Sequence, residues 1–145
     1  MTVPIVTAFA AGLLIVLQQA LMLNVGLYRG KVGIGAGIGD DQTLERKLRR
    51  HGNLAENSAL FLVALALAEM VGAPGILIAS LAGIFILCRL AHAIAFTSLA
   101  GSHTPTEGGS VYLVLRAAGA GGTALLGFIL GGTLVYTVAV QAGLL

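Results

Sequence analysis

A stripe of polar side chains opens the second long apolar segment of the chain, in the run RKLRRHGNLAEN at residues 46–57. At about 100° per helical residue, Arg46, Arg49, Asn53 and Glu56 share one face about 80° wide. Guanidinium groups donate paired hydrogen bonds to carboxylates, an amide both donates and accepts, and a carboxylate accepts only. The stripe therefore indicates one wall of a polar pocket that suits an anionic ligand.

Two later segments add polar side chains at the same end of the predicted helices. Arg89, His92 and Phe96 fall on one helical face, within about 60° of each other. Arg116 lies near the start of the last segment, and Arg29 ends the first. Because an ionisable group in a bilayer costs at least about 2.5–3.5 kcal/mol, these side chains are predicted to be functional or mutually paired.

Two structural explanations compete with a ligand site. Cations at a helix end can reach the membrane interface and fix orientation, which accounts for three residues: Arg46, Lys47 and Arg50. The other explanation makes arginines internal ion-pair partners of Glu56, with no ligand: Arg49, Arg89 and Arg116. Several guanidinium groups facing one carboxylate leave excess positive charge, however, and an anionic ligand satisfies that charge better.

The composition identifies the solvent in which these residues lie. Of 145 residues, 57% are hydrophobic and 10% are charged, with a mean hydropathy of +0.97. An ordinary soluble domain carries about 25% charged residues, so a membrane protein is predicted. The single Cys88 excludes an internal disulfide. The basic residues lie beside apolar segments, so they indicate membrane orientation, and no nucleic-acid partner is expected.

Four uncharged or weakly charged runs are long enough to cross a bilayer, which needs about 20 apolar residues. Pro74 between two glycines ends the second, and the polar run 101–110 separates the last two. We expect an all-α membrane protein, one domain over residues 1–145 that forms an antiparallel bundle of four transmembrane helices. The predicted spans are residues 3–28, 43–71, 76–99 and 111–143.

The basic residues also predict the orientation. Every Lys and Arg lies in or near the first and third loops, which share one side of the membrane in a four-helix chain. The positive-inside rule places these loops in the cytoplasm and both termini outside. We expect a bacterial inner-membrane protein in contact with lipid.

Other patterns carry less information. No His, Cys or carboxylate cluster has zinc-ligand spacing, so no metal site is predicted. Glu69 is expected at a solvated helix end. Glycines in the last span predict close helix packing: Gly119, Gly121, Gly122, Gly127, Gly131 and Gly132.

The polar residues resemble the signature of the MAPEG family, the membrane-associated proteins of eicosanoid and glutathione metabolism. The similar motifs are Glu45-Arg46-x-x-Arg49-x-His51-x-Asn53-x-x-Glu56, Arg89-Leu90-Ala91-His92-Ala93 and Arg116-x-x-Gly119. The resemblance covers nearly the whole chain. It implies a homotrimer whose active sites lie between subunits and bind glutathione as cosubstrate near the cytoplasmic face. The implied activity is a glutathione transferase or peroxidase that acts on an apolar small molecule from the membrane.

The resemblance also implies roles for individual residues. Arg116 falls where an arginine that stabilises the glutathione thiolate is expected. The residues implied in glutathione binding are Arg29, Arg49, His51, Asn53, Glu56, Arg89 and His92.

Four positions depart from the patterns of relatives. Gly52 replaces an arginine of several animal enzymes, Phe96 replaces a tyrosine of some members, and Ala59 replaces a proline. Ala117 stands where the prostaglandin-synthesising relative has serine, which argues against that isomerase activity. Two alternatives remain: a non-enzymatic membrane protein of this fold that binds lipid or small molecules, and a small four-helix exporter. The arginines around Glu56 disfavour the exporter because they would keep its carboxylate ionised.

Overall fold

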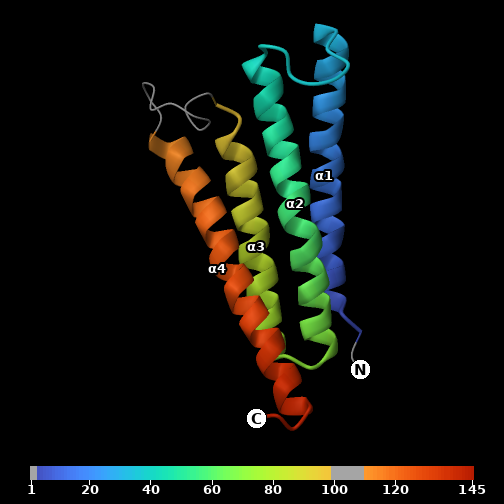
Figure 1. Cartoon of the computed structure of the whole chain (residues 1–145), viewed down its shortest axis with the longest axis vertical. Coiled ribbons are helices and arrows are strands. Elements are labelled where there is room, and N and C mark those ends of the chain that lie inside the picture. Colours follow the sequence, from blue (N-terminus) through green and yellow to red (C-terminus); the bar gives the residue numbers. More distant parts are fainter. Residues whose placement is uncertain (1–2, 99–109) are drawn as a thin grey trace.

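The computed structural model describes residues 3–98 and 110–145 and contains four helices that run alternately up and down (Figure 1). These are α1 (Ile5–Val32), α2 (Gln42–Met70), α3 (Gly75–Ala95) and α4 (Ser110–Gln141). All four are long and apolar enough to cross a membrane. The predicted four-helix membrane bundle is therefore confirmed. The predicted loop at 101–110 lies, apart from Ser110, outside the described residues.

Helix α1 extends beyond the end expected from the apolar run. It continues past Tyr28 through Arg29 and Lys31, and it stops at Gly33, which has φ 71°. The Arg29 carbonyl accepts hydrogen bonds from the backbone N–H groups of Gly33 and Ile34. Cations in a last turn interact favourably with the exposed carbonyls there, so the first charges end the apolar run but not the helix.

Helix α2 begins at an acidic cap. The Asp41 carboxylate accepts hydrogen bonds from the N–H groups of Thr43 (2.8 Å) and Leu44 (2.9 Å). The Tyr28 hydroxyl donates to the same carboxylate at 3.1 Å, which joins the cap to α1. The cap therefore fixes the start of α2 relative to the end of α1.

Glu69 is not the solvated end expected from the sequence. Its carboxylate accepts hydrogen bonds from the N–H groups of Val6 (3.0 Å) and Thr7 (2.9 Å) and from the Thr7 hydroxyl (2.7 Å). These are donors of the first turn of α1, which have no partners within their own helix. Glu69 thus caps α1 from the end of α2, a role that spacing along one helix does not indicate.

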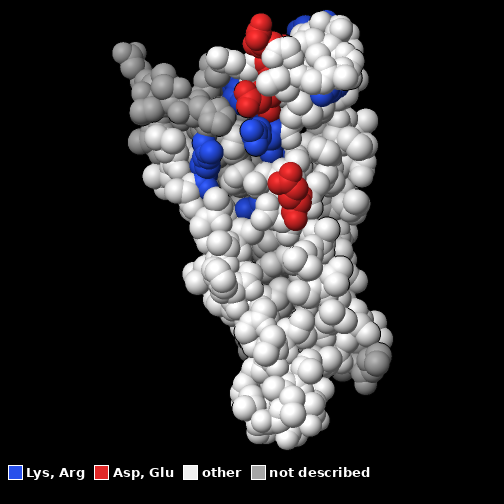
Figure 2. Space-filling model, in the orientation of Figure 1, with Lys and Arg blue, Asp and Glu red and all other residues white. Residues whose placement is uncertain are grey.

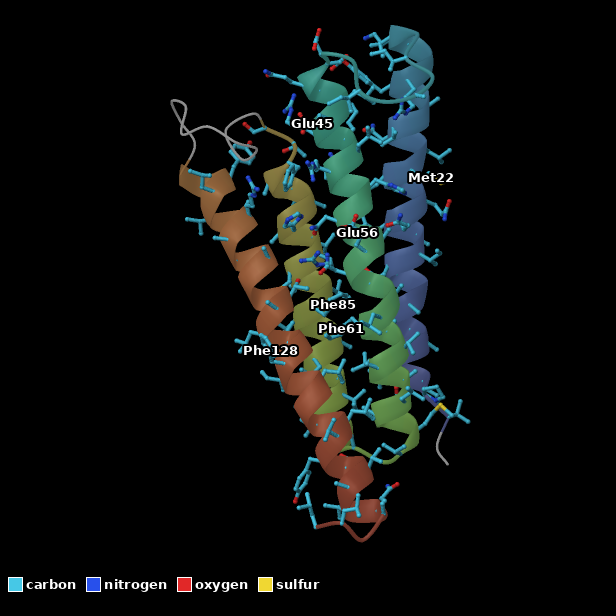
Figure 3. The ribbon with its side chains drawn as sticks, viewed as in Figure 1. Met22, Glu45, Glu56, Phe61, Phe85 and Phe128 are labelled. Atoms are coloured by element: carbon cyan, nitrogen blue, oxygen red, sulfur yellow. The ribbon has the colours of Figure 1, made fainter. Side chains whose placement is uncertain are left out.

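The core is built by all four helices, with Leu14 from α1, Leu65 from α2, Ile78 from α3 and Leu130 from α4 among its buried side chains. The rings of Phe61 and Phe85 stack with centroids 3.8 Å apart and planes 4° apart, as Figure 3 shows between α2 and α3. Outside the core, large apolar side chains such as Phe9, Leu60 and Phe128 are exposed, as expected for faces in contact with lipid.

Two of the predicted small residues bring α3 and α4 together. A Cβ at Gly119 would lie 2.7 Å from the Cys88 carbonyl oxygen and 2.8 Å from the His92 Cβ. A Cβ at Gly122 would lie 2.5 Å from the Cys88 Sγ. By contrast, Gly127 and Gly131 face open space within the single chain. Close packing inside the chain is therefore concentrated near the polar end of the bundle.

Candidate functional site

Charged side chains gather at the loop end of the molecule. Figure 2 shows them over the upper half of this face, mainly along α2, while the lower half is uncharged. The start of α1 and the end of α4 lie at the opposite end of the bundle, where Glu69 caps α1 (Figure 1). Any polar site at membrane depth on this face therefore lies in the half of the bundle nearest the α1–α2 loop.

The first half of α2 forms one wall of a polar cavity of about 260 Å³. Three residues from the predicted stripe line it, namely Arg49, Asn53 and Glu56. The remaining lining residues are Ile38, Glu45, Leu48 and Gly52. Because Gly52 has no side chain, it leaves open space beside Glu56, and the nearest atom to an added Cβ would be Glu56 Oε1 at 3.8 Å.

Arg46 belongs to the same helical stripe but not to the cavity. Its guanidinium donates to the Thr97 carbonyl at 3.3 Å and to the Thr43 hydroxyl at 3.1 Å. Arg46 therefore connects the start of α2 to the end of α3.

The cavity reaches from the interface into the hydrocarbon region. At about 1.5 Å per residue, α2 is about 43 Å long, whereas the hydrocarbon core is about 30 Å thick. Glu56 lies about 21 Å along the helix from Gln42, so it is well inside the apolar part of α2. Figure 3 places Glu45 near the start of α2 and Glu56 near its middle. Both Arg49 and Glu56 are exposed in the single chain.

The charges in the cavity wall are not paired as the ligand-free explanation requires. Arg49 lies 3.8 Å from Glu45, one turn earlier on α2, and this exposed pair is weak. Arg89 contacts Asn53 instead of Glu56. Within residues 3–98 and 110–145, Glu56 has no ion-pair partner, so it is free to meet a cation of a ligand.

Arg89 is buried behind the cavity wall, with 2% of its surface exposed. Its Nη1 donates to the Asn53 Oδ1 at 2.7 Å, and its Nη2 donates to the Gly119 carbonyl at 2.8 Å and to the Thr123 hydroxyl. Its guanidinium carbon lies 5.7 Å from the centre of the Phe85 ring. One α3 side chain thus joins α2 and α4 and does not reach the cavity itself.

His92, Phe96 and Arg116 form a second group, on α3 and α4. His92 is 5% exposed, and its ring centroid lies 4.9 Å from that of Phe96. Arg116 is half-buried, with its guanidinium carbon 5.1 Å from the centre of the Phe96 ring. His92 of α3 and Arg116 of α4 thus lie against one aromatic ring, and Arg89 does not belong to this group.

Neither Arg29, on α1, nor His51, on α2, lines the cavity. Arg29 donates to the Ile34 carbonyl at 3.0 Å. The His51 Nε2 lies 2.6 Å from the Nε2 of Gln18, a side chain that sequence reasoning missed. The sequence signal that could have identified Gln18 is its polar amide in the middle of an apolar span. Gln18 also lines a crevice of about 250 Å³ between α1 and α2.

An apolar groove of about 430 Å³ follows the polar cavity deeper into the bundle, between α2 and α4. Its lining residues are Glu56, Asn57, Leu60, Phe61, Ala64, Thr123, Ala124, Gly127, Leu130 and Gly131. Glu56 lines both spaces, so the polar cavity and the apolar groove meet at this carboxylate. The glycines at 127 and 131 widen the groove.

The chemistry of this region depends on hydrogen bonding and charge. Within residues 3–98 and 110–145, no group of three His, Cys, Asp or Glu side chains is placed to hold a metal ion. The cavity instead combines one guanidinium, one amide and two carboxylates, those of Glu45 and Glu56. This set suits a small ligand with groups of both charges.

A family model supplies the class of this protein. The model of the MAPEG family matches residues 7–136, which include α2, α3, most of α1 and α4, and every candidate site residue. The chain belongs to the MAPEG family, which includes glutathione transferases and related proteins. No curated protein matches the sequence.

Proposed function

We propose that this protein is a glutathione-dependent transferase that acts on apolar electrophiles from the membrane. The same bound thiolate could also support peroxidase activity. The observation that carries the proposal is the cavity on α2, where Arg49, Asn53 and Glu56 lie together in a chain of the MAPEG family. The cavity lies near the membrane interface, where a water-soluble cosubstrate and a lipid-soluble substrate can meet.

Glutathione has groups that match this cavity. Its two carboxylates suit guanidinium groups such as Arg49, its ammonium suits the unpaired Glu56, and its peptide groups suit the Asn53 amide. An ammonium ion would also neutralise a carboxylate that otherwise lies at membrane depth at considerable cost.

The single chain supports assembly into a homotrimer with shared sites. It exposes Glu56 on a helix surface at membrane depth, which is unfavourable against lipid. It also leaves His51 beside Gln18 of α1 and Arg29 against the Ile34 carbonyl, and neither residue lines the cavity. A neighbouring subunit that packs its α1–α2 face against this cavity would cover Glu56 and bring these two residues to the ligand.

Arg116 is our candidate for stabilising the thiolate. A thiol with a pKa of about 8.5 is only a few per cent ionised at pH 7. A nearby guanidinium that lowers the pKa of the bound thiol by about two units would contribute about 2.7 kcal/mol and make most of it nucleophilic. Arg116 stacks over Phe96 beside His92, which holds its guanidinium near the polar end of the bundle. The electrophile would lie in the apolar groove between α2 and α4.

A second candidate is non-enzymatic binding of a lipid or small molecule. It is favoured by Phe96, because the ring between His92 and Arg116 has no hydroxyl to orient a thiol. This candidate predicts ligand binding without thiolate formation.

The test uses protein purified in detergent. Glutathione should bind at millimolar concentration and develop the ultraviolet absorbance of a thiolate, and the protein should conjugate it to an apolar aryl halide. Arg116→Ala should lose the thiolate absorbance at pH 7, while Lys31→Ala, which removes an exposed cation of α1, should keep it. Absence of glutathione binding at millimolar concentration would contradict the proposal. Binding with no thiolate in the parent protein would favour the second candidate.

We further propose that the loop end of the bundle faces the cytoplasm of a bacterial cell, in the inner membrane. The concentration of charges at that end supports this orientation. A cysteine placed at Gly35 in a Cys88→Ala protein should resist a membrane-impermeant maleimide applied from outside, and one at Leu144 should react. The reverse pattern would show the opposite orientation.

A further inference from the structure

Arg89 lies behind Asn53, where 2% of its surface is exposed and its hydrogen-bond partners are all neutral. Its donors reach the Asn53 Oδ1 at 2.7 Å, the Gly119 carbonyl at 2.8 Å and the Thr123 hydroxyl. No carboxylate pairs with it within the described parts of the chain. The Thr123 hydroxyl in turn donates to the Gly119 carbonyl at 2.7 Å, so both α4 acceptors are fixed. Arg89 is therefore a buried donor held in one position by α4.

This position determines how the Asn53 amide is turned. An arginine side chain has five N–H donors and no acceptor, so only the oxygen of an amide can face it at 2.7 Å. The Asn53 Nδ2 then points the other way, and it donates to no residue that the structure describes. Since Asn53 lines the polar cavity, its two N–H donors are left for a ligand.

The neighbouring contacts keep the amide from reversing. The backbone carbonyl of Asn53 accepts a hydrogen bond from the Asn57 Nδ2 at 2.8 Å. The Asn57 amide is therefore already bonded to the backbone and does not compete for the Asn53 side chain. A reversed Asn53 amide would place N–H groups against the Arg89 Nη1. That donor would lose the Asn53 Oδ1 and keep only the Asn53 backbone carbonyl, at 3.5 Å, as an acceptor on α2. Such a loss costs about 1–3 kcal/mol.

We propose that Arg89 is a positioning residue that fixes Asn53 as a pure hydrogen-bond donor toward the cavity, so that the ligand group bound there is an acceptor, a carboxylate or a peptide carbonyl. This inference rests on the proposed glutathione site, and it assigns to Arg89 a role without ligand contact. Along one face of α2, the cavity then presents a cation at Arg49, a donor at Asn53 and an acceptor at Glu56. A ligand that fits this face must present an anion to Arg49, a hydrogen-bond acceptor to Asn53 and a cation or donor to Glu56.

The sharpest test is Asn53→Asp. An aspartate keeps an oxygen for Arg89 and gives that cation a carboxylate partner, but it presents an acceptor to the cavity where the amide presented donors. We expect the melting temperature of Asn53→Asp to equal or exceed that of the parent, and that of Asn53→Leu to fall below it. Glutathione affinity of Asn53→Asp should nevertheless fall at least about tenfold, because a donor to the ligand is replaced by a group that repels its acceptor.

A second pair of variants separates orientation from stability. Arg89→Lys has one ammonium that cannot span Asn53, Gly119 and Thr123, so it releases the amide and should lower glutathione affinity about tenfold. Glu69→Gln weakens the cap of α1 at the other end of α2 and leaves the contact between Arg89 and Asn53 intact. It should lower the melting temperature and change the affinity less than about twofold.

The outcomes are distinguishable. If Asn53→Asp binds glutathione as tightly as the parent, or if Glu69→Gln and Arg89→Lys lose affinity in proportion to their loss of stability, Arg89 has no positioning role. If Asn53→Asp is less stable than Asn53→Leu, the amide is turned the other way. This stability order needs no ligand, so failure of the parent to bind glutathione would overturn only the proposed function.

Discussion

Glu56 is the residue at which the two spaces of the site meet. It lines the polar cavity with Arg49 and Asn53, and it also lines the start of the apolar groove between α2 and α4. The arginine nearest to it in the cavity, Arg49, lies beside Glu45. A carboxylate so placed can hold the ammonium of a ligand whose reactive end lies near the groove.

Replacing Glu56 with glutamine tests this role. Glu56→Gln keeps the shape of the side chain and removes its charge, so glutathione affinity should fall about tenfold to a hundredfold. Equilibrium titration in detergent measures the change. Glu69→Gln is the matched control, because it removes a carboxylate from the other end of α2, where Glu69 caps α1. Equal loss of affinity in both variants would contradict the assignment.

Part of the residue-level site was predictable from spacing. Arg49, Asn53 and Glu56 were placed on one face by helical periodicity alone, and the structure places them on one cavity wall. The Arg89 contacts were not predictable, because they depend on the approach of three helices. Gln18 beside His51 was missed for the same reason. Helical periodicity predicts which side chains share a face of one helix, but it does not predict which neighbouring helix that face contacts.

At the scale of elements, the close approach of α3 and α4 positions the Arg89 network. Gly119 supplies the carbonyl that Arg89 contacts, and its missing side chain lets the α3 backbone pass nearby. The polar end of α4 is therefore held by a glycine and a buried cation together.

Gly119→Ala should destabilise the bundle. The added methyl would meet the Cys88 carbonyl oxygen and the His92 backbone at less than 3.0 Å, and backbone atoms cannot move aside easily. Overpacking of this kind costs about 1–3 kcal/mol. Thermal unfolding in detergent measures the loss. Gly121→Ala is the control, since nothing lies within 4 Å of an added Cβ there, and it should leave stability equal or higher. Equal melting temperatures for the two variants would contradict this account of the packing.

The cap of α2 gives a prediction for pH. The N–H of Leu44 is the main cause that holds the pKa of Asp41 below its ordinary value of 3.8, with further lowering by hydrogen bonds from Tyr28 and Thr43. A lowered pKa in the folded state means that the charged cap stabilises the protein above pH 3.8 and that this contribution is lost as the pH falls through the lower value.

Asp41→Asn isolates this effect, because asparagine is also a good cap but does not titrate. The parent should be the more stable protein near neutral pH, and its advantage in melting temperature should shrink below about pH 4. An advantage that stays constant or grows on acidification would show that the Asp41 charge does not stabilise the cap.

The boundaries of the elements show where sequence reasoning stops. Four helices followed from the lengths of the apolar runs, because a bilayer sets the required length. The extension of α1 to Val32 was not expected, since its last turn contains Arg29 and Lys31. Glu69 was also misjudged, because its partners are the free N–H groups of a helix more than sixty residues away in sequence. Hydropathy finds the membrane segment, whereas caps and tertiary contacts set the helix ends.

At the scale of the whole molecule, one chain carries residues of the proposed site on opposite sides of α2. The cavity with Arg49, Asn53 and Glu56 lies on one side, and His51 with Gln18 lies on the other. If subunits pack around a threefold axis, the cavity of one chain meets the α1–α2 face of the next. The proposed active site is then complete only in the assembled protein.

The most direct measurement is a structure of the protein in lipid nanodiscs with millimolar glutathione, determined by electron cryomicroscopy. We predict a trimer in which glutathione contacts Arg49, Asn53 and Glu56 of one subunit together with Arg29 or His51 of its neighbour, with an acceptor group of the ligand at the Asn53 Nδ2. A protein that binds no glutathione in this cavity, or that binds it with contacts from one subunit only, would contradict the account.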